Sequence, residues 1–304
     1  MEFVLETMAL CKQYKHFKAL NDLNMHVPKG AIYGFVGKNG AGKTTLIRVI
    51  TGLQEPSSGE YAIYGVKNDD KAIARIRKRI GAVVESPSIY MDMTAEENLK
   101  AQFITLGMPS FDRINELLQL VGLGHTGAKK VKNFSLGMKQ RLGIAIALSG
   151  NPDFLILDEP VNGLDPQGII ETRELIMKLN RERGITVLIS SHILDELSRI
   201  ATWYGFIDSG HIVKEMSAEE LEQACRKKTV VKVSDITAFV RVLDEKSLDY
   251  RIINESTAEL YQSIAVTTLS DAAKEAGCTI ISMNEQDESL ESFYLNLVGG
   301  DSNE

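Results

Sequence analysis

The sequence has no long hydrophobic run. Its longest apolar stretches, residues 142–148 and 154–157, fall far short of the roughly 18 to 20 residues that a membrane-spanning helix needs. The first six residues carry acids where a secretory signal has a basic region. We therefore expect a chain that stays in the cytoplasm and has no direct membrane insertion.

Cysteine is scarce. Cys11, Cys225 and Cys278 are odd in number and show no CxxC or metal-ligand spacing, which argues against a disulfide framework and against a zinc site. We expect all three to be small buried hydrophobic residues in a reducing compartment.

An excess of basic charge is also missing, because 34 Lys and Arg residues are outnumbered by 41 Asp and Glu residues, for a formal net charge of -7. Non-specific nucleic-acid binding needs a basic face that displaces counterions from phosphates, so we expect no nucleic-acid partner. The 304 residues, 44% hydrophobic and 25% charged, are typical of a folded protein with two domains.

Short β-branched runs alternate with helical patterns up to about residue 216, and this alternation predicts a mostly parallel sheet covered by helices. The clearest strands are expected at 31–36, 80–84, 154–157 and 186–190. Helices are expected at 43–51 and 169–183, closed by Gly52 and Gly184. Residues 205–213 predict a tight hairpin.

After about residue 218 the pattern restarts. Strands are expected at 229–233, 250–253, 259–264 and 279–283, and helices at 236–246, 269–276 and 290–298. Apart from the last helix, this order is βαββαβ, which is typical of a small ferredoxin-like α+β domain. We therefore expect a first domain over residues 1–218 and an accessory domain over residues 219–304.

A phosphate-binding loop follows the strand at 31–36 and precedes a helix. Its residues match GxxxxGK[ST] and are Gly37, Lys38, Asn39, Gly40, Ala41, Gly42, Lys43, Thr44 and Thr45. The glycines allow several N–H groups to point into one concavity, and the helix directs its positive dipole end there. We expect Lys43 to neutralise the β- and γ-phosphates of a nucleotide and Thr44 to bind Mg²⁺.

Two acids end the strand at 154–157, at the edge where open α/β sheets bind ligands. Neighbouring side chains on a strand point to opposite sides, so we assign the two acids different tasks. Asp158 is expected to hold Mg²⁺ and Glu159 to orient or deprotonate the attacking water. His192 follows the strand at 186–190 and is expected to contact the γ-phosphate.

Residues Phe134–Arg141 are similar to the LSGGQ signature of the ATP-binding cassette (ABC) family. With the phosphate loop, the acid pair, Asn162–Asp165 and His192 in the family's order, they make the first 220 or so residues resemble an ABC nucleotide-binding domain. The resemblance implies an α/β P-loop NTPase fold with an antiparallel β-subdomain and a helical subdomain, and ATPase activity with ATP and Mg²⁺. It also implies a head-to-tail homodimer in which each ATP meets residues of the second copy, namely Ser135, Leu136, Gly137 and Asp165.

Tyr14 resembles the aromatic residue that stacks on adenine in this family, with Tyr33 and Phe17 as alternatives. Glu85 stands where the family usually has glutamine, and we expect it to join Thr44 and Asp158 around Mg²⁺. Leu136, Met138 and Asn162 also depart from the usual motifs. These departures and the additional C-terminal domain resemble the bacitracin- and lantibiotic-resistance branch of ABC exporters.

That branch implies an ATPase on the inner face of the cell membrane, which powers export of a peptide antibiotic, lantibiotic or drug through a separate transmembrane permease. Substrate choice then belongs to the permease. The alternative is an ABC ATPase that acts on ribosomes or DNA. The single cassette disfavours an ATPase that acts on ribosomes, and the short interval between Lys43 and Ser135 disfavours one that acts on DNA. A small-molecule kinase leaves Phe134–Arg141 without a role.

Overall fold

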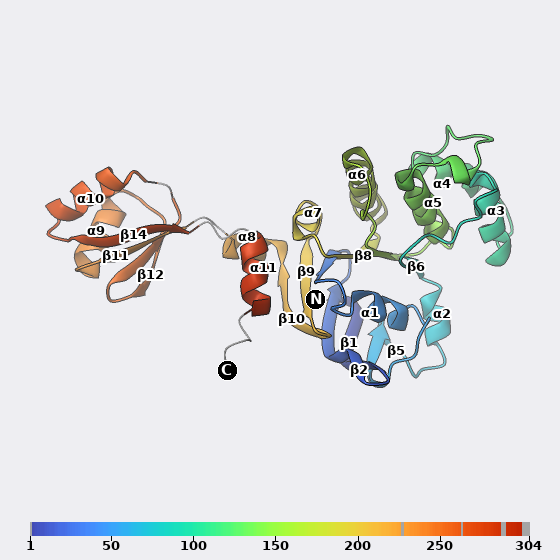
Figure 1. The fold of residues 1–304 in the computed structure, drawn as a ribbon, viewed down its shortest axis with the longest axis horizontal. Helices are drawn as coiled ribbons and strands as arrows, with labels where there is room; N and C mark the ends of the chain where they lie inside the picture. The colour runs from blue at the N-terminus through green and yellow to red at the C-terminus, as the bar shows by residue number, and fades with distance from the viewer. Residues whose placement is uncertain (1, 226–227, 263, 287–289, 300–304) are drawn as a thin grey trace. The chain divides into compact units, whose positions relative to one another are not determined.

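The computed structural model describes residues 2–225, 228–262, 264–286 and 290–299 (Figure 1). The chain divides into two compact units, Met1–Ala218 and Glu219–Glu304, which we call unit 1 and unit 2. Within the described residues, no helix combines the length and the hydrophobicity that crossing a bilayer requires.

A six-stranded sheet forms the centre of unit 1, in the order β10-β9-β3-β8-β7-β6. Neighbouring strands run parallel except for the β9–β10 hairpin. The strands are β3 (Ile32–Val36), β6 (Ile80–Val83), β7 (Phe154–Asp158), β8 (Thr186–Ser191), β9 (Trp203–Asp208) and β10 (His211–Ser217). Every residue of β3, β7 and β8 is buried, as expected for strands covered on both faces. The carboxyl ends of these three strands therefore meet at one edge.

A second, antiparallel sheet of unit 1 has the order β2-β1-β4-β5. Its strands are β1 (Phe3–Tyr14), β2 (Phe17–Pro28), β4 (Ser58–Ile63) and β5 (Val66–Lys67). Helix α1 (Lys43–Ile50) lies between the two sheets (Figure 1) and buries Leu46, Ile47, Val49 and Ile50 in a core shared with both. This packing fixes the start of α1 against the end of β3.

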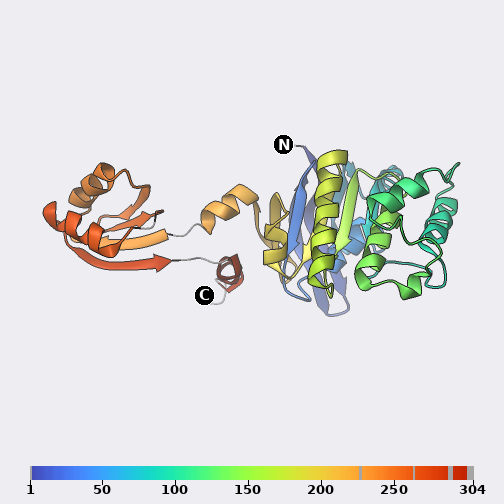
Figure 2. The same ribbon diagram turned by 90° about the horizontal axis from the view of Figure 1, so that it is seen from above.

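Helices α6 (Pro166–Arg183) and α7 (Leu194–Ser198) cover the other face of the six-stranded sheet (Figures 1 and 2). A group of helices lies to the side of it and holds α3 (Ala95–Thr105), α4 (Arg113–Leu120) and α5 (Leu136–Leu148), with the 3₁₀ turn η1 (Val131–Asn133) before α5. The short α2 (Ile73–Arg77) precedes β6. Helix α3 starts with a capping box between Thr94 and Glu97, and the backbone N–H of Thr94 is the main cause of the lowered pKa of Glu97.

Unit 2 has a four-stranded antiparallel sheet in the order β12-β13-β11-β14. Its elements after α8 (Ala218–Ala224) are β11 (Lys228–Val233), α9 (Ile236–Glu245), β12 (Tyr250–Asn254), β13 (Thr257–Leu260), α10 (Val266–Glu275), β14 (Ile280–Gln286) and α11 (Leu290–Gly299). Phe239 and Leu243 of α9 and Leu269 of α10 share one core with the sheet. The βαββαβ order predicted from the sequence is therefore present.

Two expectations about the fold were wrong in detail. The strand expected at 259–264 is β13, which begins at Thr257 and ends at Leu260; position 263 lies outside the described residues. The chain reverses earlier because Asn254 Oδ1 accepts from the Ser256 N–H, so that Thr257 already pairs with Asn254. Cys11 and Cys278 are buried, but Cys225, near the end of α8, is half-buried.

Candidate nucleotide-binding and hydrolysis site

The phosphate loop connects β3 to α1 through positions that need glycine. Gly40 and Gly42 have φ values of 83° and 113°, in the region that favours glycine. A Cβ on Gly42 would lie 2.5 Å from the Ala19 carbonyl oxygen, and one on Gly37 would lie 2.6 Å from the Ile207 carbonyl oxygen. The backbone carbonyls of Ala19 and Ile207 therefore pack closely against one side of the loop.

The backbone N–H groups of residues 43–45, at the start of α1, have no acceptor within the described part of the chain. Helix starts leave such donors free, and they add to the positive end of the helix dipole. A phosphate fits this combination of donors and glycine-rich loop.

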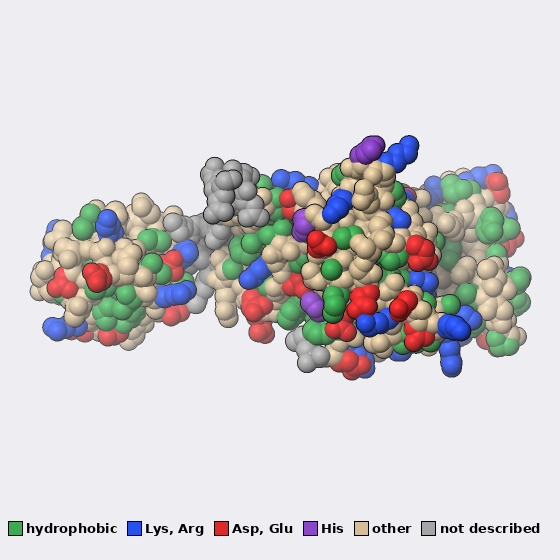
Figure 3. All heavy atoms as spheres, turned by 90° about the horizontal axis from the view of Figure 1, so that it is seen from below, with side chains coloured by type: hydrophobic (Ala, Val, Ile, Leu, Met, Phe, Trp, Pro, Cys, Tyr) green, Lys and Arg blue, Asp and Glu red, His purple; other side chains and the backbone are tan. Residues whose placement is uncertain are grey.

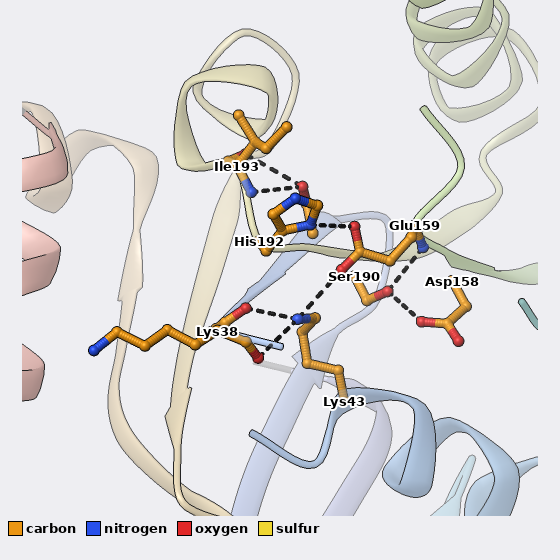
Figure 4. A network of polar contacts seen from close by, with 9 residues as sticks. Lys38, Lys43, Asp158, Glu159, Ser190, His192 and Ile193 are labelled. Carbon is orange, nitrogen blue, oxygen red and sulfur yellow. Dashed lines mark hydrogen bonds and ion pairs between the residues drawn. The ribbon is translucent and has the colours of Figure 1, made fainter. Parts of the chain in front are cut away.

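Lys43 is a buried cation that points back across its own loop. Its Nζ donates to the Gly37 carbonyl at 2.6 Å and to the Lys38 carbonyl at 3.2 Å (Figure 4). It also lies 3.2 Å from Glu159 Oε1. The sequence-predicted phosphate ligand and the sequence-predicted base are therefore in contact.

Asp158 is buried at the end of β7, and only one of its oxygens is satisfied. Its Oδ1 accepts from Ser190 Oγ at 2.5 Å, while Oδ2 has no partner in the described structure. A buried carboxylate oxygen without a partner is costly unless a cation or water meets it. Mg²⁺ prefers oxygen ligands of this kind, so Asp158 fits the assigned role, together with the half-buried Thr44.

Glu159 lies between two basic side chains (Figure 4). Its Oε2 is 2.8 Å from His192 Nδ1, and its Oε1 faces Lys43. Its backbone has φ 49° and donates to both the hydroxyl and the carbonyl of Ser190. The strands β7 and β8 thus fix the carboxylate beside the phosphate loop.

Ser190 was not among the residues expected at the site, yet it contacts both acids. Its hydroxyl donates to Asp158 and accepts from the Glu159 N–H. The signal available in the sequence was a small polar residue at the end of a buried strand adjacent to the acids, which is weak because such residues commonly end strands.

The three aromatic candidates for adenine stacking lie in different environments. Tyr14 ends β1, is 38% exposed and donates its hydroxyl to Gln54. Phe17 pairs with it across the β1–β2 hairpin and is 59% exposed. Tyr33 is fully buried and donates to Glu215 at 2.6 Å; burial is the main cause of its raised pKa. The ring of Tyr33 is therefore inaccessible to an adenine base, and Tyr14 and Phe17 remain as candidates.

Glu85 follows β6 and points to a different partner from the one expected. Its carboxylate lies 2.7 Å from the Arg48 guanidinium of α1. Within the described residues no hydrogen bond joins Glu85 to Thr44 or Asp158. The Glu85 carboxylate is therefore paired with Arg48, and its expected place around Mg²⁺ with Thr44 and Asp158 stays a prediction.

The signature residues lie at the start of α5. Ser135 is exposed and caps the helix by accepting from the Met138 N–H, so its own O–H remains available as a donor. A Cβ on Gly137 would lie 3.7 Å from Gly168 and 3.9 Å from Leu164, while Asp165 caps α6 by accepting from the Gly168 N–H. Leu136, Gly137 and Asp165 are thus neighbours in one chain, and the described structure has no bond from them to the phosphate loop.

The comparisons with known proteins all point to the same family. The model of the ABC transporter family matches residues 20–162. The bacitracin transport ATP-binding protein BcrA of Bacillus licheniformis is 40% identical over 303 residues, which cover 99% of each protein. The lantibiotic transport ATP-binding protein SrtF of Streptococcus pyogenes is 44% identical over 223 residues, 72% of this chain and 95% of its own.

Solved structures with the same fold come from this family too. CbiO1 of Clostridium perfringens, part of an ABC transporter complex, aligns with a TM-score of 0.66 and 28% identity over 73% of this chain and 92% of its own. The cassette MJ0796, solved as a dimer with ADP and Pi, aligns with a TM-score of 0.63 and 27% identity over 70% of this chain and 98% of its own. This chain therefore belongs to the ABC transporter family as one of its ATP-binding, ATP-hydrolysing proteins, in the branch of the bacitracin and lantibiotic transport ATP-binding proteins.

Proposed function

We propose that this chain powers the export of a peptide antibiotic by hydrolysing ATP, as a homodimer bound to a separate transmembrane permease at the inner face of the cell membrane. The observation that carries the proposal is the meeting of Lys43, Asp158 and Glu159 at one edge of the sheet, beside the free N–H groups of α1. The transported class is supported by relatives named for bacitracin and lantibiotic transport.

The phosphates of ATP bind the loop from Gly37 to Thr45, where backbone N–H groups and Lys43 neutralise their charge. The γ-phosphate competes with Glu159 for Lys43, because both are anions and the Lys43–Glu159 distance is already 3.2 Å. Binding therefore releases the Glu159 carboxylate from its ion pair. Tyr14, at the end of β1, stacks on the adenine.

Mg²⁺ would supply positive charge that offsets the negative charge of the phosphates. Thr44 and Asp158 would hold it, since Asp158 Oδ2 is a buried oxygen without a partner in the described structure. Glu85 joins them only if it leaves Arg48, because one carboxylate oxygen is already engaged there.

Glu159 then accepts a proton from the attacking water or orients it. His192 holds the other carboxylate oxygen at 2.8 Å and thereby restricts the rotation of Glu159. The same imidazole contacts the γ-phosphate once Glu159 has moved. The backbone bonds from Glu159 to Ser190 keep the side chain at the end of β7 during this exchange.

Dimerisation completes the site. Ser135 caps α5 and Gly137 lies in its first turn, which makes this a second anion-binding helix start; Ser135 and Leu136 are exposed, and Gly137 is buried. In the proposed dimer, this helix start and the neighbouring Asp165 meet the γ-phosphate on the other copy's phosphate loop. The dimeric cassette MJ0796 supports such an assembly.

The permease docks where the segment after β6 borders a cavity of about 400 Å³ between that strand and α5, which includes Val84, Pro87 and Gly143 in its lining. Large apolar side chains are exposed in the same segment, at Tyr90, Met91 and Met93. Several exposed apolar side chains in one short segment are typical of a protein interface.

A nucleic-acid substrate is disfavoured by the distribution of charge. Figure 3 shows acidic and basic side chains interspersed over the described part of the face it draws, without a broad basic surface. Together with the net charge of -7, this argues against the DNA- or ribosome-acting alternative.

The function is tested by co-expressing the chain with its permease, reconstituting the complex in lipid nanodiscs and measuring ATP hydrolysis with bacitracin or a lantibiotic. We expect the peptide to stimulate hydrolysis, and the Glu159→Gln complex to show no stimulation. Sedimentation of the chain with ribosomes, and no co-purification with any membrane protein, would reject the proposal.

A further inference from the structure

An ion pair between Arg48 and Glu85 joins the last turn of α1 to the segment that follows β6. Arg48 lies in the last turn of α1, the helix that starts at the phosphate loop, and Glu85 follows β6. Their side chains meet at 2.7 Å with exposed fractions of 34% and 60%. Glu85 has φ 60°, which non-glycine residues adopt rarely and mainly where surrounding contacts enforce it.

The residues after Glu85 pack directly against the signature helix. A Cβ on Gly143 of α5 would lie 2.6 Å from the Pro87 Cβ, so the Pro87 ring packs against the helix at a position that has no side chain. The chain then runs along the cavity between β6 and α5. We call residues 85–93 the linking segment.

The far end of the linking segment is bonded to the residues that precede the signature. Asn98 of α3 exchanges two hydrogen bonds with the backbone of Tyr90, at 2.7 and 3.0 Å. The carbonyls of Met91 and Met93 accept from the N–H groups of Lys132 and Val131, at 2.8 and 2.9 Å. Contacts are therefore continuous from α1 through Arg48, Glu85 and Pro87 to both ends of the signature region.

We propose that Arg48 is a positioning residue which, through Glu85, couples nucleotide binding at α1 to the arrangement of the linking segment and the signature helix. The proposal rests on the proposed function, because it assigns the signature to the nucleotide site. In the described part of the chain, no side-chain hydrogen bond or ion pair joins Arg48 to the phosphate loop; Arg48 acts by holding Glu85. Glu85 is in turn the only described anion bonded to Arg48.

Hydrogen exchange of the full-length chain, with and without the non-hydrolysable analogue AMP-PNP and Mg²⁺, tests the coupling. In the wild type we expect the analogue to slow exchange over residues 86–93 and 134–138. In Arg48→Gln, exchange of residues 86–93 without nucleotide should rise by about two- to fivefold, the factor expected for one partly exposed ion pair. The analogue should still bind, and the slowing over residues 86–93 should be lost.

The charge-swapped double variant Arg48→Glu with Glu85→Arg should recover the slowing, which a purely local loss of packing would not. Lys67→Gln is the matched control, because Lys67–Glu60 is an exposed ion pair of similar length, 2.8 Å, within the β4–β5 hairpin. It should leave exchange of the linking segment unchanged.

The proposal is overturned if Arg48→Gln retains the wild-type response, or if the swapped pair fails to recover it while binding AMP-PNP normally. A failure of the proposed role of the signature would instead appear in the wild type itself, as binding of the analogue without any slowing over residues 134–138.

Discussion

Glu159 has two basic partners before any nucleotide is present. Lys43 holds one oxygen and His192 the other, and the backbone has a left-handed φ of 49°. Such a conformation costs on the order of 1 kcal/mol or more and persists where surrounding bonds enforce it, here the two bonds to Ser190. The Glu159 carboxylate is therefore paired with the same Lys43 that is expected to bind the γ-phosphate, so ATP has to displace it.

Replacing Glu159 with Gln removes the base and the ion pair with Lys43 together. We expect ATP to bind as well as or better than before, because Lys43 is no longer paired with a carboxylate, while steady-state hydrolysis falls by about 10²- to 10⁴-fold. Phosphate release and equilibrium ATP binding measure the two effects. Glu116→Gln, which removes an exposed ion pair with Arg183, is the control. Normal turnover by Glu159→Gln would show that another group is the base.

Tyr14 and Phe17 are distinguished by removing one ring at a time. Tyr14→Ala should weaken ATP binding by about 5- to 150-fold, the equivalent of the roughly 1 to 3 kcal/mol that stacking on a base contributes. Tyr14→Phe keeps the ring and loses only the bond to Gln54, so its affinity should stay close to that of the wild type. A larger loss in Phe17→Ala than in Tyr14→Ala would assign the stacking to Phe17.

At the level of elements, the phosphate loop depends on Gly42. Gly42→Ala places a Cβ 2.5 Å from the Ala19 carbonyl at φ 113°, so the loop has to shift and ATP binding should fall at least about tenfold. Gly65→Ala is the control, because Gly65 has φ 75° but nothing within 4 Å of the added Cβ. It should lose about 1 kcal/mol of stability and no ATP affinity. Equal ATP affinities in the two variants would contradict this account of the loop.

The buried strands were predictable because hydrophobic burial on both faces leaves a continuous β-branched run. Residues 154–157 and 186–190 show it, and β7 and β8 are confirmed within one residue. The long strands β1 and β2 were not predicted from the sequence. Their register shifts repeatedly, and Ala9 and Asp22 have positive φ, so no strict alternation of polar and apolar residues survives.

Individual contacts at the site were less predictable than the elements that carry them. Order along the chain indicated that Lys43, Asp158 and Glu159 would share a sheet edge, because parallel strands end together. It did not indicate that Glu85 would pair with Arg48, since the partner lies on another element and an exposed carboxylate has many possible neighbours. Side-chain pairing of this kind is decided by packing rather than by spacing.

At the scale of the whole molecule, one copy holds half of each proposed site. The phosphate loop and the signature both begin helices, α1 and α5, and both present free donors. Only the family resemblance suggested that the two halves meet between copies, because a single chain has no sequence signal for its own dimer. Unit 2 has its own core and sheet.

The dimer is expected to depend on nucleotide. Glu159→Gln with ATP and Mg²⁺ should double the mass measured by light scattering, and removal of Mg²⁺ with EDTA should return the monomer, because the γ-phosphate is the shared ligand. Ser135→Phe should stay monomeric under the same conditions while ATP still binds its phosphate loop. Mass doubling without nucleotide would place the interface elsewhere.

The most direct test is an experimental structure of the Glu159→Gln chain with ATP and Mg²⁺. We expect two nucleotides, each held by Lys43 of one copy and within hydrogen-bond distance of Ser135 and Gly137 of the other, with Asp158 beside the metal. A structure in which Ser135 and Gly137 are remote from every bound nucleotide would contradict it.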